Sequence, residues 1–263
     1  MSPRALGDYQ GYIFDLDGTV YLGEHLLPGA DRALANLRAA GKRVAFISNK
    51  PIGRATEYAQ KLRKLGVSAA DHEVINSPVA LRLYLKQANL GRRVLLIGEE
   101  PVREELERGG FEVVSDPAQA EIVVVSWDRS VNYERLNAAL QALRAGAHFV
   151  ATNPDVTCPL PGGCEALDAG SFIALLEAAS GRSVEAVAGK PSPLMLQVIM
   201  QRWGLEPGEC LLLGDRLDTD LELGRRAGAA VALVLTGVTT REQARAWPVQ
   251  PDYLLESVAD LAD

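Results

Sequence analysis

Residues 12–19 read Tyr-Ile-Phe-Asp-Leu-Asp-Gly-Thr, a short apolar run that ends in two acids. The run predicts a buried strand, and the two-residue spacing in extended chain places the Asp15 and Asp17 carboxylates on one side. Gly18 then allows the chain to turn sharply. Because open α/β sheets bind ligands at the carboxyl ends of their strands, this stretch indicates the sheet edge where a site is expected.

Outside this stretch, apolar runs alternate with longer segments of helical period, which is typical of repeated βαβ units. The expected strands are residues 12–15, 43–48, 94–98, 121–127, 147–152, 210–215 and 230–236. The expected helices are residues 31–40, 55–65, 77–88, 99–108, 132–144, 169–179, 193–203 and 219–227. The predicted fold class is therefore α/β, with a doubly wound, mostly parallel, Rossmann-like sheet.

Two further expected strands also end in polar residues. One is followed by Ser48, Asn49 and Lys50, and the other by Gly214-Asp215-Arg-Leu-Asp-Thr-Asp220. Each group alone is an ordinary loop with a helix cap, and Asp218 is interpreted as such an N-cap. Together, four or five acids at one sheet edge would repel one another unless a cation lay between them. Ligation by carboxylate oxygens suits Mg²⁺.

Lys190 lies in Gly-Lys-Pro-Ser-Pro, a rigid turn just before an expected helix. A cation at a helix start is unfavourable against the helix dipole, so this lysine is either a solvated side chain or one fixed for an anion. The combination of acids for Mg²⁺, a lysine, a hydroxyl and a carboxylate able to attack phosphorus favours a phosphoryl-transfer site.

Composition limits the classes of partner. The 263 residues carry 27 basic and 34 acidic side chains, a net charge of -7, which argues against nucleic acid polymers and membrane surfaces. Three cysteines cannot form a disulfide framework, so a reducing, cytoplasmic location is expected. We expect neither a signal peptide nor a membrane span, because the longest apolar run is far too short.

The order of these motifs resembles the haloacid dehalogenase (HAD) superfamily of phosphatases. Residues 15–21, 189–193 and 214–220 look like the NagD-like branch, subfamily IIA, which carries an α/β cap of the C2 type inserted in its core. The resemblance implies a catalytic core of residues 1–78 and 182–263, and a cap of residues 79–181 that selects the substrate.

The resemblance also implies roles for individual residues. Asp15 would be the nucleophile that forms an aspartyl-phosphate, and Asp17 the general acid and base. The implied phosphate-binding residues are Ser48, Asn49 and Lys190. The implied ligands of Mg²⁺ are Asp15, the main-chain oxygen of Asp17, Asp215 and Asp220, the last directly or through water.

Substrate selection is expected from a second group of residues. Many members of the branch have asparagine where this chain has Lys50, which leaves two roles open: contact with a second anionic group of the substrate, or a solvated side chain. Asn153, Asp155 and the following loop at 156–164 would contact the leaving group. A homodimer through the cap is also suggested by the resemblance.

The predicted function is Mg²⁺-dependent hydrolysis of small soluble phosphomonoesters, such as sugar phosphates or nucleoside monophosphates. A phosphotransferase or phosphomutase with the same residues is an alternative. A phospho-accepting receiver protein is another, although receivers are about half this length. Dehalogenation is disfavoured because that reaction gives no clear role to the metal-binding acids. A catalytically inactive binding protein is the last alternative. The presence of every acid expected of the site argues against it, because a binding protein would not need them all.

Overall fold

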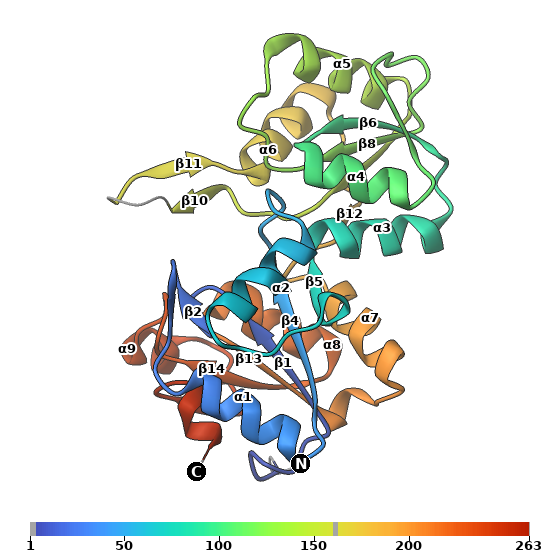
Figure 1. Ribbon diagram of the computed structural model, residues 1–263. Helices are drawn as coiled ribbons and strands as arrows, with labels where there is room; N and C mark the ends of the chain where they lie inside the picture. Colours follow the sequence, from blue (N-terminus) through green and yellow to red (C-terminus); the bar gives the residue numbers. More distant parts are fainter. Residues whose placement is uncertain (1–3, 160–162, 263) are drawn as a thin grey trace. The chain divides into compact units, whose positions relative to one another are not determined.

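The protein is described by a computed structural model that covers residues 4–159 and 163–262 (Figure 1). The chain separates into two compact units. Unit 1 comprises Met1–Ser48, Ala55–Ile75 and Lys190–Asp263, and unit 2 comprises Asn49–Arg54 and Asn76–Gly189. The expected fold class, an α/β protein with Rossmann-like parallel sheets, is confirmed.

Unit 1 is built on a six-stranded sheet with the order β15-β14-β13-β1-β4-β5. Its strands are β1 (Gly11–Asp15), β4 (Arg43–Ser48), β5 (Val74–Asn76), β13 (Cys210–Gly214), β14 (Ala230–Val234) and β15 (Tyr253–Leu255). All pairings from β15 through β4 are parallel. A small antiparallel hairpin of β2 (Tyr21–Leu22) and β3 (His25–Leu26) follows β1.

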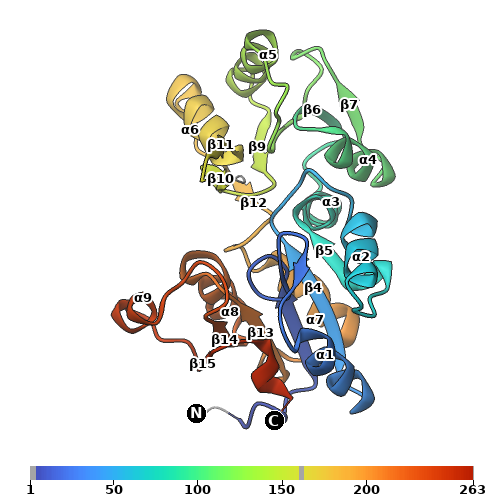
Figure 2. The same cartoon turned by 60° about the vertical axis from the view of Figure 1, so that its left-hand side comes forward.

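Helices cover both faces of this sheet, so its strands are buried throughout (Figure 2). Alternate strand residues, such as Phe14 and Phe46, pack against α1 (Ala30–Ala39) and α2 (Ala55–Lys64). On the opposite face, a Cβ on Gly224 of α8 (Glu222–Ala227) would lie 2.1 Å from Val231. The remaining helices of unit 1 are α7 (Leu194–Trp203), α9 (Arg241–Ala246), the π-helical turn η3 (Leu217–Leu221) and the 3₁₀ turns η1 (Asp71–Glu73), η2 (Pro207–Glu209) and η4 (Val258–Leu261).

The chain order fixes where a ligand site is expected in unit 1. After β1 the chain adds β4 and β5 on one side, and it later returns to add β13, β14 and β15 on the other side. The strand order therefore reverses between β1 and β13. A doubly wound sheet leaves a crevice at the carboxyl ends of the strands at this position.

Unit 2 has its own five-stranded parallel sheet, with the order β12-β9-β8-β6-β7. Its strands are β6 (Arg93–Ile97), β7 (Glu112–Val114), β8 (Ile122–Val125), β9 (His148–Ala151) and β12 (Ala186–Val187). Its helices are α3 (Ser77–Ala88), α4 (Glu100–Arg108), α5 (Tyr133–Arg144) and α6 (Ala169–Ser180). The antiparallel pair β10 (Thr157–Pro159) and β11 (Glu165–Leu167) completes the unit.

One face of this second sheet carries a separate hydrophobic core. Val123, Val125 and Phe149 of the strands pack against Leu143 of α5 and Leu176 of α6, and all five side chains are buried. Unit 2 therefore buries an apolar core of its own, as an independent domain does.

Most of the expected elements are present within one or two residues of their predicted bounds. The strand at 43–48 and the helix at 77–88 match fully. Glycines with positive φ follow several helices, and they are Gly41, Gly66, Gly146, Gly181, Gly204 and Gly228. The expected helix at 219–227 is different, because η3 precedes a shorter α8.

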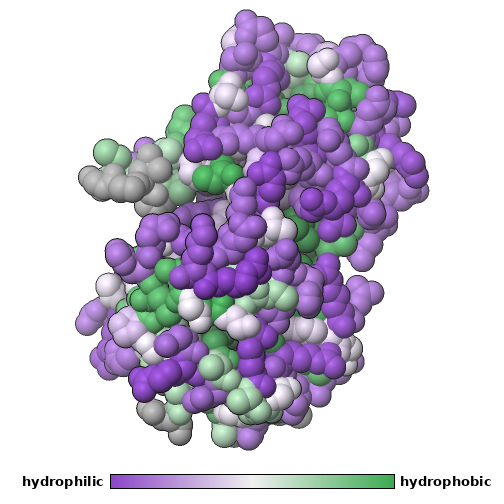
Figure 3. All heavy atoms as spheres, in the orientation of Figure 1, coloured by the Kyte–Doolittle hydropathy of each residue, from purple (hydrophilic) through white to green (hydrophobic). Residues whose placement is uncertain are grey.

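Among the described residues, no helix combines the length and the apolar character that crossing a bilayer requires. Hydrophilic side chains cover most of the face seen in Figure 3. All three cysteines are free.

Candidate active site

The loop after β1 begins the site. Asp15 is the last residue of β1, and it is buried. The carbonyl of Leu16 accepts hydrogen bonds from the N–H groups of Val20 (2.9 Å) and Tyr21 (3.2 Å), and the Gly18 N–H donates to the Tyr21 carbonyl (2.8 Å). Gly18 has φ +85°, which only glycine adopts readily. The half-buried Asp17 lies in this tight turn, two residues after Asp15.

The neighbouring strand contributes Ser48. In the parallel pairing of β1 with β4, Ile47 lies opposite Asp15, so Ser48 is the next residue along this edge. Ser48 is also buried. The register thus places Ser48 at the same end of the sheet as the predicted nucleophile.

Lys190 lies between two of the predicted acids. Its Nζ is 2.8 Å from Asp15 Oδ1 and donates a hydrogen bond of 2.7 Å to Asp220 Oδ1. Only 4% of the lysine is exposed, so the ammonium has exchanged water for these two carboxylates. A buried charge is tolerated only with such partners.

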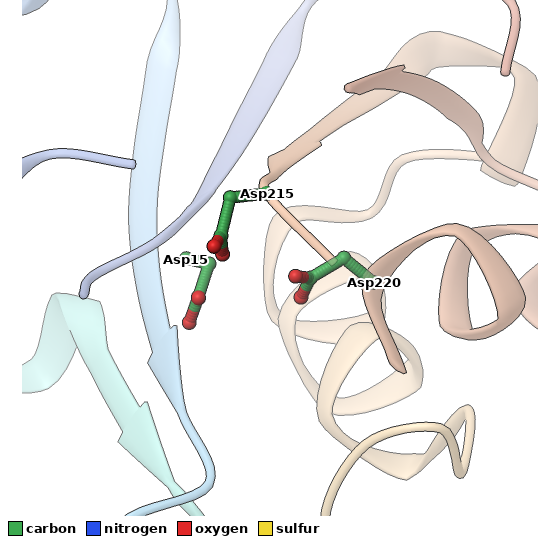
Figure 4. A group of neighbouring side chains, drawn as sticks. All are labelled: Asp15, Asp215 and Asp220. Atoms are coloured by element: carbon green, nitrogen blue, oxygen red, sulfur yellow. The ribbon is translucent and has the colours of Figure 1, made fainter. Parts of the chain in front are cut away.

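Three aspartates form one cluster (Figure 4). Asp15 is the last residue of β1, Asp215 directly follows β13, and Asp220 lies in η3. One carboxylate oxygen from each of Asp15, Asp215 and Asp220 lies within 4.8 Å of the other two. All three side chains are buried. They meet where the strand order reverses, so the acids predicted from separate strand ends form a single group.

Glycines allow this close approach. A Cβ on Gly214 would lie 2.3 Å from the Cβ and Cγ of Asp220, and one on Gly18 would lie 2.6 Å from Oδ2 of Asp215. Real side-chain atoms do not come this close, so a larger residue at either position would displace an aspartate.

The loop after β14 also supports the cluster, although it is not among the motifs predicted from the sequence. Val238 N–H donates to Asp215 Oδ2 at 2.7 Å, and the Thr236 hydroxyl donates to the Gly18 carbonyl at 2.6 Å. A Cβ on Gly237 would lie 2.0 Å from Asp215 Oδ2. The sequence feature that could have indicated this loop is the Thr236-Gly237 pair, which follows a buried strand closely at the same sheet edge as the other motifs.

Burial and mutual repulsion shift the acidity of the cluster. Burial raises the pKa of Asp15 to about 7, although the charge of Lys190 opposes this. Burial and the charge of Asp220 raise the pKa of Asp215 to about 6. Burial disfavours the charged form of Lys190, but Asp15 and Asp220 hold its pKa above the ordinary value. The carboxylates thus outnumber the one ammonium, and a further cation would relieve their repulsion.

The donor set fits a hard divalent cation. Asp215 Oδ1 is buried and, within the described parts of the chain, has no hydrogen-bond partner, whereas Oδ2 is held by Val238. Both oxygens of Asp220 accept hydrogen bonds, from Lys190 at 2.7 Å and from the Arg216 N–H at 3.1 Å. An orphaned carboxylate oxygen beside Asp15 is compatible with a divalent metal ligand.

The N-cap interpretation of Asp218 is wrong. The residue lies inside η3, whose N-cap is Arg216. Its carboxylate accepts hydrogen bonds from Arg216 Nε at 3.1 Å and Nη2 at 2.8 Å, and its side chain is 57% exposed. The π-helical turn begins before Asp218, so no free helix terminus remains for it to cap.

The residues expected to select the substrate belong to unit 2. Asn49 Nδ2 and Asn153 Nδ2 both donate to Asp155 Oδ2, at 2.9 and 3.1 Å. Asn153 also donates to Asp168 Oδ1 at 3.1 Å. Burial raises the pKa of Asp168, and the charge of Lys50 opposes this shift. Hydrogen bonds therefore connect Asn49, Asn153, Asp155 and Asp168 in one network, and Lys50 acts on Asp168 through its charge. Part of the loop at 156–164, residues 160–162, lies outside the described residues.

Two family models match the chain. Residues 12–112 match haloacid dehalogenase-like hydrolases, and residues 187–261 match HAD-hydrolase-like proteins. The chain is 34% identical over 251 residues to sugar-phosphatase AraL of Bacillus subtilis, covering 95% of this chain and 91% of that protein. The chain belongs to the haloacid dehalogenase superfamily of hydrolases.

Other relatives narrow this class. The chain is 35% identical over 274 residues to chronophin of Mus musculus, with 98% of this chain and 94% of that protein covered. The structure of 4-nitrophenylphosphatase from Thermotoga maritima is similar with a TM-score of 0.92 at 36% identity, over 98% of both chains. NagD from E. coli gives a TM-score of 0.88 at 28% identity, over 96% of this chain and 98% of that one. The chain is a NagD-like HAD-type phosphatase, as the sequence predicts.

Proposed function

We propose that this phosphatase hydrolyses small soluble phosphomonoesters, with Asp15 as the nucleophile. The observation that carries the proposal is the contact between Lys190 and Asp15 beside Asp215 and Asp220. The ammonium favours the ionised form of Asp15, which is the form that can attack phosphorus. The names of the relatives, which include a sugar phosphatase and phosphoglycolate phosphatases, support small organic phosphates as substrates.

In the proposed reaction, a carboxylate oxygen of Asp15 forms a bond to phosphorus while the bond from phosphorus to the ester oxygen breaks. Asp17 donates its proton to the departing alkoxide, and the product is an alcohol and an aspartyl-phosphate. Asp17, now ionised, accepts a proton from water, whose oxygen attacks the same phosphorus. Inorganic phosphate leaves and Asp15 is regenerated.

The remaining residues of the site would stabilise charge on the transferring group. Ser48 and Lys190 would donate hydrogen bonds to the phosphoryl oxygens, and Lys190 would also offset the charge of Asp15. We propose Mg²⁺ as the cofactor, held by Asp15, the main-chain oxygen of Asp17 and Asp215. When bound, Mg²⁺ supplies positive charge that favours the trianionic transition state. Asp220, with both oxygens occupied, would act through water or by orienting Lys190.

Unit 2 is proposed to contain the substrate-selecting cap, residues 79–181. Its separate sheet and core support this division. Lys50, Asn153 and Asp155 would then contact the leaving group. The attachment of Asn49 to Asp155 supports treating Asn49 and Lys50 together with the cap rather than with Ser48. A homodimer through the cap stays a prediction.

The proposal is tested with Asp15→Asn and 4-nitrophenyl phosphate in the presence of Mg²⁺. We expect turnover to fall by roughly a thousandfold or more, since the amide is a far weaker nucleophile. Asp218→Asn is the matched control, because this acid of the same motifs is exposed and paired with Arg216. Equal losses in both variants, or retained turnover in Asp15→Asn, would contradict the assignment.

A panel of sugar phosphates, nucleoside monophosphates and phosphoglycolate identifies the substrate class. Release of inorganic phosphate on multiple turnovers is expected from a hydrolase. Transfer of the phosphoryl group to a second hydroxyl without phosphate release would instead support the phosphotransferase alternative. Inactivity on the whole panel would contradict the proposed class of substrates.

A further inference from the structure

Unit 2 contains a cavity of about 680 Å³ that none of the predicted site residues lines. Its wall comes from the end of β6, the start of α4, the strand β7, the segment after β8 and the first half of α5. The volume lies within the range of small-molecule sites in proteins, about 300–1,000 Å³. The residues of this cavity belong entirely to unit 2.

The cavity lies where the strand order of the second sheet reverses. The chain passes from β6 to β7 on one side of β6 and then crosses to β8 on the other side. Gly98 and Glu99 follow β6, and Arg129 and Ser130 follow β8 closely, so the carboxyl ends of both strands contribute to the wall. This is the position at which doubly wound sheets bind ligands, and the aspartate cluster occupies the equivalent position in unit 1.

A missing helix explains why this position is open. Residues 115–121 connect β7 to β8 through turns, without the helix that usually forms such a crossover. The apolar side chains of Leu95, Val113 and Ala138 therefore line the cavity. An apolar wall of this kind suits the hydrocarbon or ring portion of a ligand.

Three arginines lie on the polar side of the cavity. Arg103, Arg129 and Arg135 line it together with Glu99 and Glu100. Arg129 is fixed by Glu99, which accepts from its Nε and Nη2, each at 2.7 Å.

The other two arginines differ in how firmly they are held. Arg135 pairs with the buried Asp128 at 2.6 Å, whereas the nearest carboxylate oxygen to Arg103, on Glu100, is 3.7 Å away. Arg103 is thus the guanidinium in the lining best able to turn toward an anion.

We propose that this cavity binds a small organic anion, with its phosphate or carboxylate group on Arg103 and Arg129 and its apolar portion on Leu95 and Val113. Ser115 supplies a hydroxyl group for the remaining oxygens, whereas the Ser130 hydroxyl donates to Asp128 at 2.8 Å. The site is separate in its residues from the aspartate cluster. It therefore gives the protein a second ligand besides the phosphate ester that it hydrolyses.

The test uses two probes that the protein does not hydrolyse, phenylphosphonate and benzoate. Each is titrated into the full chain in the presence of a chelator, with binding followed by saturation-transfer nuclear magnetic resonance. Without metal the aspartate cluster has three acids against one lysine and does not attract anions. We expect saturable binding of at least one probe, and the preferred probe identifies the anionic group.

Three variants locate the bound probe. Arg103→Gln should weaken binding by about tenfold, as expected for a lost charge-assisted hydrogen bond, and Glu100→Gln should strengthen it. The Arg103 side chain is 40% exposed and that of Glu100 63%, and neither is part of the buried core, so we expect both variants to fold. Arg92→Gln, an exposed arginine of unit 2 outside the cavity, should leave binding unchanged. Absence of metal-independent binding, or equal binding by Arg103→Gln and Glu100→Gln, would overturn the proposal.

Discussion

Asp215 owes its position to the backbone around it. Its Oδ2 accepts from the Val238 N–H, and Gly18 and Gly237 lie so close that neither has space for a Cβ. This arrangement leaves Oδ1 as the one oxygen of Asp215 without a partner among the described residues. A carboxylate held in this way needs little reorganisation when a cation binds, which is the advantage of a preorganised site.

Gly237→Ala tests this steric argument. The new Cβ would lie 2.0 Å from Asp215 Oδ2, so either the carboxylate or the loop must move. We expect the affinity for Mg²⁺, measured by calorimetry, to fall by roughly tenfold or more. Gly208→Ala is the control, because a Cβ there meets nothing within 4 Å. Unchanged Mg²⁺ affinity in Gly237→Ala would show that Asp215 tolerates displacement.

Thr236→Val tests the hydrogen bond between two loops of the site. The Thr236 hydroxyl donates to the carbonyl of Gly18, which follows Asp17 in the chain. Its loss should lower the free energy of unfolding by about 1–2 kcal/mol and reduce kcat by about tenfold as the Asp17 turn loosens. Thr236→Ser should restore most of kcat. If the serine variant were no better than valine, the hydroxyl would have no positioning role.

The segment from Asn49 to Arg54 follows β4 of unit 1 but is held by unit 2. Ser77 Oγ donates to the Asn49 carbonyl at 2.6 Å, and Asn76 Nδ2 donates to the Gly53 carbonyl at 2.9 Å. Arg54 pairs with Glu104 of α4. The chain therefore passes between the two units directly after Ser48, so Ser48 and Asn49 are neighbours in sequence but belong to different bodies.

Asp155→Ala should loosen this segment. The change removes the acceptor shared by Asn49 and Asn153, and both lost hydrogen bonds are charge-assisted. We expect amide exchange across residues 49–54 to accelerate by about tenfold, measured by hydrogen–deuterium exchange, while β13 in unit 1 stays protected. Asp116→Ala, in the turn after β7, is the control. Exchange at 49–54 equal to the control would mean that Asp155 does not restrain the segment.

The elements that the sequence predicts well are those with a regular hydrophobic pattern or a distinctive local composition. β4 and α3 have the predicted bounds because a continuous apolar run and a proline-containing helix start define them locally. β7 and β12 have only three and two residues, and they exist because a neighbouring strand offers hydrogen bonds. Elements this short carry no periodic signal, so only the tertiary structure determines them.

The same distinction applies to the site. Asp15 and Asp215 could be predicted because acids after buried strands gather at one sheet edge. Thr236 and Val238 contribute a hydroxyl and a backbone N–H to that edge, and many residue types could occupy such positions. The attachment of Asn49 to unit 2 depends on Asp155, more than a hundred residues away, and no local pattern indicates it.

At the scale of the whole molecule, the net charge of -7 is concentrated in part at the aspartate cluster. Asp15, Asp215 and Asp220 are buried with Lys190 as the cation between them. Their repulsion opposes folding of the metal-free protein, and a bound cation removes it. Metal binding and stability are therefore linked, because a ligand of the folded state stabilises that state.

This linkage predicts that stability depends on pH more strongly without metal than with it. The pKa of Asp15 is raised to about 7 and that of Asp215 to about 6, against roughly 3.9 in the unfolded chain. The folded metal-free state therefore binds more protons than the unfolded state between about pH 4 and 7. Its free energy of unfolding should fall by about 1–3 kcal/mol as the pH rises from 5.5 to 7.5.

Mg²⁺ competes with those protons, so its stabilising effect should be greater at pH 7.5 than at pH 5.5 and should remove most of the loss. Urea denaturation at both pH values, with chelator and with Mg²⁺, measures the four free energies of unfolding. Asp215→Asn removes one of the titrating carboxyls, and the metal-free variant should show a smaller pH dependence than the unmodified chain. A metal-free protein that is as stable at pH 7.5 as at pH 5.5 would contradict the raised pKa values and, with them, the repulsion that the cation is expected to relieve.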